Sequence, residues 1–153
     1  MEKLHLYLVR HCESLGNREN IFQGQLDLDI SATGEKQLAL LALRFRNIPI
    51  DAVYSSPLKR AYKTAEAVDL YHSLPIIKLP ELMEVDVGAL SGMKLDKAFA
   101  DYPVFAEKWQ NSPQNCIFPE GETTAEVYDR AKKALARVKA DCMGKTAVIT
   151  SHG

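Results

Sequence analysis

The chain has 153 residues, of which 46% are apolar and 25% charged, and its formal net charge is -1. This length and composition are typical of one soluble globular domain with a substantial core. A net charge near zero excludes a global field that would recruit nucleic acid or an anionic membrane, so we expect neither as a partner.

The cysteines and the N-terminus bear on the cellular compartment. Cys12, Cys116 and Cys142 form an odd, sparse set without a C-x-x-C pair. They argue against a disulfide framework or a structural zinc site and fit a reducing compartment. The apolar run from Leu4 to Val9 is too short for a signal peptide core or a membrane span. We therefore expect a cytoplasmic protein.

The first third of the chain predicts a strand, a loop and a helix. Residues 4–9, "LHLYLV", form a continuous apolar run that is typical of a central strand buried on both faces. Residues 11–30 are polar and predict a loop. Ser31 is a good N-cap for a helix whose apolar residues recur at helical spacing, namely Leu38, Leu41, Ala42 and Phe45.

Two further strands and a helix are predicted in the middle of the chain. Residues 50–55 predict a strand, followed by Ser56 as N-cap and Pro57 at the first helical position. A helix is then expected from Pro57 to about Leu70. The segment "LPIIKLP", residues 74–80, predicts a third short strand.

The last third combines an irregular segment with a strong helix and strand. Residues 81–121 carry several glycines and prolines and predict irregular structure with short helices, in which Trp109 is expected to pack. Thr123 or Thr124 opens a long helix that Gly144 ends, and residues 146–151, "TAVITS", predict a fourth strand.

The alternation of strands and helices predicts an α/β fold with a doubly wound, mainly parallel central sheet flanked by helices. Ligands bind such sheets beyond the carboxyl ends of the strands. "RHC", "SSPLKR" and "SHG" each follow a predicted strand, so Arg10, His11, Arg60 and His152 should meet at one rim. Two guanidinium groups and the helix start at Ser56-Pro57 would suit a phosphate dianion.

Several blocks of the chain resemble the histidine phosphatase superfamily, the phosphoglycerate-mutase-like family, in its phosphatase and mutase branch. They are "RHCES", "GQLDLDISATGEKQ", "SSPLKRAYKTAE", "LMEVDVGALSG", "FPEGETTAEVYDRA" and "ITSHG", in the family's order. The resemblance runs from residue 4 to the last residue. It implies one domain over residues 1–153 and a phosphohistidine enzyme that uses no metal or other cofactor.

The resemblance also implies roles for individual residues. His11 would be the nucleophile, Arg10, Arg60 and His152 would complete the phosphate pocket, and Asn17 would contact the phosphate from the first loop. Glu84 would be the proton donor. From the residues alone, Glu81, Glu84 and Asp86 are all suitably placed carboxylic acids, and only the family pattern selects Glu84.

The chemistry is reasonable without the family. A neutral imidazole can attack phosphorus in line, and water can cleave the resulting covalent intermediate. Surrounding cations stabilise the charge on the equatorial oxygens. A carboxylic acid with a raised pKa can protonate the leaving alkoxide and then activate water.

Cys12 stands where the family usually has glycine, and this difference creates two alternatives. "HCESLGNR" matches the H-C-x5-R signature of cysteine-dependent phosphatases, in which Cys12 would attack and Arg18 would hold phosphate. No Asp-Pro occurs to supply the acid of that class, and "SHG" stays unexplained. Alternatively, Cys12 could crowd a site built around glycine and leave a non-catalytic phosphate-binding module.

The choice between phosphatase and phosphoglycerate-type mutase rests on the segment after "GALSG". Mutases of the family carry a longer, arginine-bearing insert there. In this chain, residues 93–119 contain no arginine, and their cationic side chains are Lys94, Lys97 and Lys108. We therefore expect a phosphatase acting on a small phosphorylated metabolite, similar to the broad-specificity and α-ribazole-phosphate phosphatases. Family members normally continue beyond "SHG", so the domain is expected to end early here and the intact product to be longer. The substrate and the oligomeric state stay open.

Overall fold

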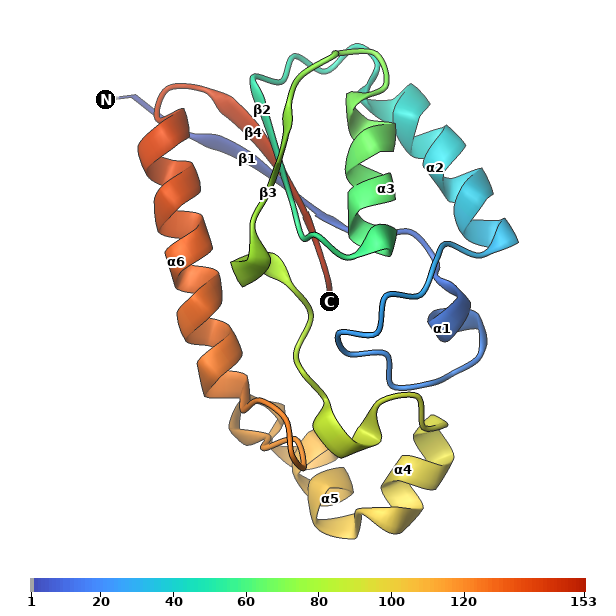
Figure 1. The fold of residues 1–153 in the computed structure, drawn as a ribbon. Helices are drawn as coiled ribbons and strands as arrows, with labels where there is room; N and C mark the ends of the chain where they lie inside the picture. The colour runs from blue at the N-terminus through green and yellow to red at the C-terminus, as the bar shows by residue number, and fades with distance from the viewer. Residues whose placement is uncertain (1) are drawn as a thin grey trace.

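The computed structural model describes residues 2–153 and contains a four-stranded, fully parallel sheet (Figure 1). Its strands are β1 (His5–Arg10), β2 (Ala52–Ser55), β3 (Ile76–Lys78) and β4 (Thr146–Ser151). Their order in the sheet is β1-β4-β2-β3, so the last strand in sequence lies between the first two. The predicted α/β class with a parallel central sheet is confirmed.

Helices cover both faces of the sheet (Figure 1). Those that flank it are α2 (Ala32–Phe45) and α3 (Lys59–Asp69) on one face and α6 (Thr124–Cys142) on the other. Three shorter helices, α1 (Leu15–Arg18), α4 (Leu95–Asp101) and α5 (Pro103–Asn111), and the 3-10 turns η1 (Pro80–Leu82), η2 (Gly88–Leu90) and η3 (Pro113–Asn115) lie in the connections.

Three clusters of buried apolar side chains hold these layers together. One joins α6 to the sheet and includes Tyr54, Val138 and Ile149. The second joins α2 and α3 to the opposite face and includes Phe45 and Val148. Successive side chains of β4 therefore pack into the two clusters in turn, Ile149 into the first and Val148 into the second. This is expected of a strand buried on both faces.

The third cluster lies outside the sheet, in the segment between β3 and α6. Its buried members include Phe22, Leu90, Phe105 and Phe118, and α4 and α5 pack around them. The segment predicted as irregular, residues 81–121, thus contains two helices and a small aromatic core of its own. Phe22 ties this core to the first loop.

The sequence located two helix starts correctly and one wrongly. Ser31 caps α2 by accepting from the Gly34 N–H, and Thr123 caps α6. The predicted cap at Ser56 is wrong, because α3 begins two residues later than Pro57, at Lys59. The Ser56 hydroxyl makes a long local contact with the Leu58 N–H at 3.4 Å and a shorter one with His152 Nε2 at 2.8 Å. The contact with His152 is tertiary, and local capping rules do not reveal it.

The first strand is not central, and this expectation is also wrong. Within residues 2–153, β1 pairs only with β4 and forms an edge of the sheet. Tyr7 and Leu8 are consequently 39% and 74% exposed. The continuous apolar run predicted burial on both faces because a single sequence does not show how many neighbours a strand has.

In the described part of the chain, no helix combines the length and the apolar character needed to cross a bilayer. The division of the chain into one domain stays a prediction.

Gly34 generates a prediction about stability, because α2 and the loop after β1 touch at this residue. A Cβ on Gly34 would collide with the backbone oxygen of Glu13 and the side chain of Ile30. We expect Gly34→Ala to lower the free energy of unfolding by about 1–3 kcal/mol, the usual range for overpacking. Denaturant unfolding followed by circular dichroism measures this change.

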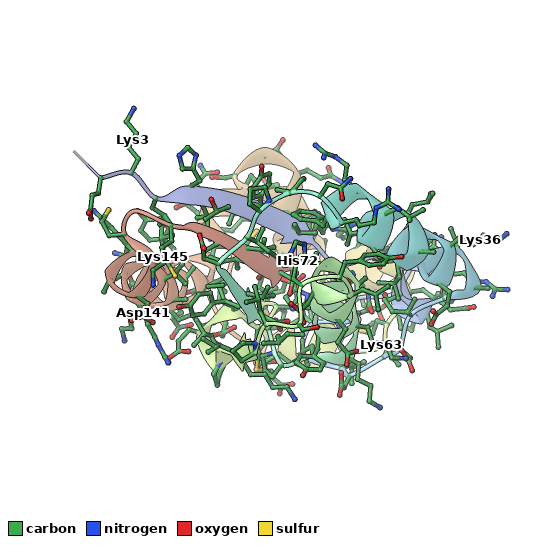
Figure 2. All side chains as sticks on the ribbon, turned by 90° about the horizontal axis from the view of Figure 1, so that it is seen from above. Lys3, Lys36, Lys63, His72, Asp141 and Lys145 are labelled. Atoms are coloured by element: carbon green, nitrogen blue, oxygen red, sulfur yellow. The ribbon has the colours of Figure 1, made fainter. Side chains whose placement is uncertain are left out.

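Lys36→Ala is the matched control, since Lys36 lies on the same helix and projects away from the sheet (Figure 2). It should change the unfolding free energy by less than about 0.5 kcal/mol. Equal stability of the two variants would contradict the tight contact between α2 and the loop.

Candidate active site

Three strands deliver the predicted residues to one rim of the sheet. Arg10 at the end of β1 is level with Ser151 at the end of β4, and Ser55 at the end of β2 is level with Thr150. Backbone hydrogen bonds extend this register, from His11 N–H to the Ser151 carbonyl at 2.9 Å and from Ser56 N–H to the Thr150 carbonyl at 3.0 Å. The predicted meeting of the three segments is therefore observed.

His11 is buried and held in one orientation. Its Nδ1 lies 2.7 Å from the Cys12 carbonyl oxygen, which accepts only and so requires a proton on Nδ1. The other nitrogen, Nε2, is then left with its lone pair. Burial lowers the pKa of His11 to about 4, and the charges of Arg60 and Arg10 add to this effect. The imidazole is therefore neutral near pH 7.

His152 lies beside His11, with ring centroids 5.2 Å apart. Its Nε2 is 2.8 Å from the Ser56 hydroxyl, while its Nδ1 is buried without a hydrogen-bond partner. Burial lowers the pKa of His152 strongly, and the neighbouring Arg60 and His11 lower it further. The second imidazole is also neutral, with one nitrogen free to meet a ligand.

Arg60 is fully buried at the base of the site. Its Nη1 and Nη2 donate to the carbonyls of Leu26 and Gly24 at 2.8 and 2.7 Å, and its Nε is buried without a partner. Within residues 2–153 no carboxylate forms an ion pair with this guanidinium. A buried cation that forms no ion pair and has an unused donor is suited to binding an anion.

Arg10 and Asn17 border the same site. Arg10 is exposed at the end of β1, and both residues line the cavity that contains His11. The Asn17 amide oxygen accepts from the backbone N–H of Ser14 at 3.0 Å and closes a capping box at the start of α1. This bond fixes the side-chain amide, whose Nδ2 remains available for a ligand.

The start of α3 does not provide the anion site that the sequence predicts. Of its first N–H groups, that of Leu58 points to the Ser56 hydroxyl at 3.4 Å. That of Lys59 donates to the carboxylate of Asp27 at 2.7 Å. An acidic side chain from the first loop therefore occupies the position that a phosphate would need.

Among the three candidate acids, only Glu84 lines the cavity that contains His11 and Arg60. Burial raises the pKa of Glu84, and this effect outweighs the Val85 N–H bond at 2.9 Å and the charges of Arg60, Arg130 and Arg10. Asp86 is engaged elsewhere, because its carboxylate accepts from the Gly88 N–H. The geometry thus favours the same acid as the family pattern.

Arg130 of α6 positions the segment that carries Glu84, a role that the sequence patterns did not reveal. Its guanidinium donates to the carbonyls of Glu81, Met83 and Glu84 and forms an ion pair with Glu122 at 2.9 Å. The signal was present in "PEGETTAEVYDRA", which contains both Glu122 and Arg130. The Glu84 carbonyl lies 46 residues from Arg130 along the chain, so this contact was not predictable from the block.

The segment after Cys12 does not form a phosphate cradle. Backbone N–H groups that a cysteine phosphatase would direct at phosphate already have partners: Cys12 donates to Thr64, Glu13 to Gln37, and Leu15 to Asp29. Burial raises the pKa of the Cys12 thiol, so it stays protonated, and Arg18 is exposed. The cysteine mechanism therefore has no support in the geometry.

Cys12 also does not strain the backbone. The non-glycine residues with positive φ are Asn20, Ser73 and Glu120 among those the structure describes, and Cys12 is not one of them. Cys12 lines a separate, open hollow between β1 and α2, which also contains Leu40 and Arg44. The concern that Cys12 crowds the pocket and leaves a mere binding module is therefore not supported.

Two hollows share Arg10 and His11 in their lining, and the other lining residues show which of them can be the active site. The hollow between β1 and α2 contains neither Arg60 nor Glu84. The second cavity, of about 570 Å³, contains both, together with Arg10, His11 and Asn17. This second cavity is the candidate active site, because a group bound there would meet His11, the two guanidinium groups and Glu84 together.

Comparison with known proteins gives relatives that cover most of the chain. A Hydrogenobacter thermophilus protein named phosphoserine phosphatase 1 is 40% identical over 147 residues, which are 96% of this chain and 70% of that protein. A protein of Escherichia fergusonii named probable phosphoglycerate mutase GpmB is 31% identical over 98% of this chain and 70% of its own length.

Solved structures agree with this result. Bacillus stearothermophilus YhfR superposes with a TM-score of 0.92 at 29% identity, over 98% of this chain and 74% of its own. A mycobacterial glucosyl-3-phosphoglycerate phosphatase in complex with VO3 gives a TM-score of 0.87 at 26% identity, over 97% and 75% of the two chains. Residues 6–153 match the sequence model of the histidine phosphatase superfamily, branch 1. With that match over nearly its whole length, the chain belongs to the histidine phosphatase superfamily.

Proposed function

We propose that this chain is a metal-independent phosphatase that hydrolyses a small phosphomonoester through a phosphohistidine intermediate on His11. The observation that carries the proposal is the hydrogen bond from His11 Nδ1 to the Cys12 carbonyl. It fixes the tautomer, so that a neutral imidazole presents the Nε2 lone pair to a site with two guanidinium groups. The phosphatase names of several relatives support the same reaction.

In the first step, His11 Nε2 attacks phosphorus in line, the P–N bond forms and the bond to the ester oxygen breaks. Arg10 and Arg60 stabilise the charge on the equatorial oxygens, and the unpartnered Arg60 Nε is a further donor. In this reaction the Ser56 hydroxyl donates to His152 Nε2, so that the proton of the neutral ring lies on Nδ1 and can also be donated to the phosphate. The fixed charges of the guanidinium groups take the part that a metal ion takes in other phosphatases.

Glu84 acts on the leaving group. Its raised pKa favours the protonated acid, which gives its proton to the departing alkoxide. The resulting carboxylate then takes a proton from water as the water attacks phosphorus and the P–N bond breaks. Inorganic phosphate leaves, and the enzyme returns with His11 neutral and Glu84 protonated.

A phosphoglycerate-type mutase is the alternative, because relatives such as GpmB carry that name. A mutase must hold a second acidic group of its bisphosphate. Over residues 2–153 the cavity is lined by no cationic side chain other than Arg10 and Arg60, which the transferring phosphate already uses. This favours hydrolysis, and comparing phosphate release with phosphoglycerate interconversion distinguishes the two.

The first prediction from the proposed function concerns the nucleophile. His11→Ala should lower kcat by about 10⁴-fold or more, as expected for removal of a covalent nucleophile. Cys12→Ser should keep most of the activity, because the thiol has no part in the reaction. Rapid quenching with radiolabelled substrate should trap an acid-labile, alkali-stable phosphoenzyme in the wild type and in Cys12→Ser only. A phosphoenzyme that iodine cleaves would instead identify Cys12 as the nucleophile.

The second prediction concerns pH. With an alkyl phosphate, kcat/KM should fall as pH drops through about 4, where His11 becomes protonated. It should also fall on the alkaline side as Glu84 loses its proton, at a pH above the usual range of a glutamic acid. In Glu84→Gln the rate with an alkyl phosphate should fall by about 10² to 10⁴-fold and the alkaline limb should lose the contribution of residue 84.

The substrate's own ionisation is the same for both proteins, so the difference between the two profiles isolates Glu84. With para-nitrophenyl phosphate, whose phenol leaves without acid help, Glu84→Gln should be far less impaired. An equal loss with both substrates would argue against Glu84 as the proton donor.

The third prediction concerns Arg60. Inorganic phosphate at 100 times its Kd should stabilise the wild type by about 2.7 kcal/mol and raise its Tm. Arg60→Lys should lose most of this shift, because an ammonium group cannot keep both carbonyl bonds and still offer donors to the anion. Lys59→Ala, an exposed neighbour on α3, should keep the full shift. A phosphate shift that persists in Arg60→Lys would place the anion elsewhere.

A further inference from the structure

The cavity that contains His11 continues away from the phosphate site toward α5. Its far end is formed by apolar side chains that come from several elements. These are the first loop, the residue before η2, helices α4, α5 and α6, and the segment before α6. The side chains are Phe22, Val87, Leu95, Trp109, Phe118 and Val127. In a phosphatase with the reaction proposed above, phosphorus lies at His11. The far end therefore surrounds the leaving group.

Trp109 is the largest side chain of this wall and packs against three aromatic rings. Its indole makes edge contacts with Phe22 and Phe118, with ring centroids 6.0 and 5.8 Å apart, and lies 5.8 Å from the ring of Phe105. The residue is nevertheless 40% exposed. The packing expected from the sequence is present, and it leaves part of a fixed aromatic surface uncovered in the cavity.

Charged groups are absent from this end of the cavity in the part of the chain that the structure describes. The charged lining residues are Arg10, Arg60 and Glu84, all at the phosphate end. Of the three lysines of residues 93–119, Lys94 and Lys97 form ion pairs with Glu19 and Asp101. Lys108 lines a different hollow, beside Tyr102 and Phe105, and not this cavity. The polar groups at the far end are the uncharged side chains of Gln114 and Thr124.

This lining selects between kinds of leaving group. A carboxylate or ammonium group next to the ester oxygen would lose its hydration without gaining a counter-charge, because Arg10 and Arg60 already hold the phosphate. An aromatic or branched apolar group would instead replace water against Trp109 and its neighbours. Building on the proposed function, we propose that the substrates are phosphomonoesters of uncharged, apolar alcohols large enough to reach Trp109, and that Trp109 determines this specificity.

The test compares alkyl phosphates that differ in the group attached to the ester carbon. For 2-phenylethyl phosphate, kcat/KM should exceed that for ethyl phosphate, phosphoserine and 3-phosphoglycerate by about tenfold or more, the usual discrimination of an apolar pocket. Phosphoserine has the more acidic alcohol, so intrinsic leaving ability would favour it. A preference for phosphoserine or 3-phosphoglycerate overturns the inference while leaving the phosphatase reaction intact.

Variants then assign the specificity to one residue. In Trp109→Ala the ratio of kcat/KM for 2-phenylethyl phosphate to that for ethyl phosphate should fall about tenfold. Gln110→Ala, on the same helix but outside the cavity, should keep the ratio. Trp109→Leu retains bulk in the aromatic cluster and should show an intermediate ratio if truncation to alanine disturbs folding. A ratio unchanged in both Trp109 variants overturns the assignment.

Binding can be followed without turnover, because Trp109 is the single tryptophan of the chain. In His11→Ala, 2-phenylethyl phosphate should change the indole fluorescence with a Kd about tenfold lower than that of phosphoserine. The fluorescence titration thus reports recognition of the leaving group, and the turnover assays report catalysis. No turnover of any of these esters would refute the proposed function, whereas equal binding of the two esters to His11→Ala would refute the leaving-group inference alone.

Discussion

The buried positive charge of Arg60 is the constraint around which the site is built. Removing a cation from water is costly unless polar groups surround it, and in residues 2–153 no carboxylate is paired with it. The first loop supplies the compensation by aiming the carbonyls of Gly24 and Leu26 at the guanidinium. This turn of the loop requires glycine at position 24. Its φ of +48° is strained for residues with a side chain, and a Cβ there would collide with Val87. The loop that carries Phe22 into the lining of the candidate active site is thereby anchored to α3.

Bonds to backbone carbonyls position His11 and the segment that carries Glu84. The Cys12 carbonyl orients His11, and Arg130 collects three carbonyls around Glu84. Burial raises the pKa of Glu84, and the single hydrogen bond from the Val85 N–H and the charges of nearby arginines do not outweigh this effect. In the described part of the chain Glu84 forms no salt bridge. A positioned, buried carboxyl group with a raised pKa and no salt bridge is consistent with the proton-donor role proposed for Glu84.

The sequence predicted features that depend on local patterns and on general topology. Apolar spacing and caps at Ser31 and Thr123 located α2 and α6, and the rule for parallel sheets brought His11 and His152 to one rim. Prediction from the sequence failed where the interacting residues lie far apart in the chain. The Ser56 hydroxyl is used by His152, and β4 pairs with only one side of β1, and neither relation leaves a trace in the neighbouring residues.

The same β1 edge has a consequence for handling the protein. A six-residue strand with one unpaired side in the described part of the chain offers backbone donors and acceptors to another chain, and Leu8 adds an exposed apolar side chain beside them. A formal net charge of -1 gives little mutual repulsion between molecules. We therefore expect molecules of this chain to associate through the β1 edge, and a pH away from the pI near 6.4 adds the charge repulsion that opposes this association.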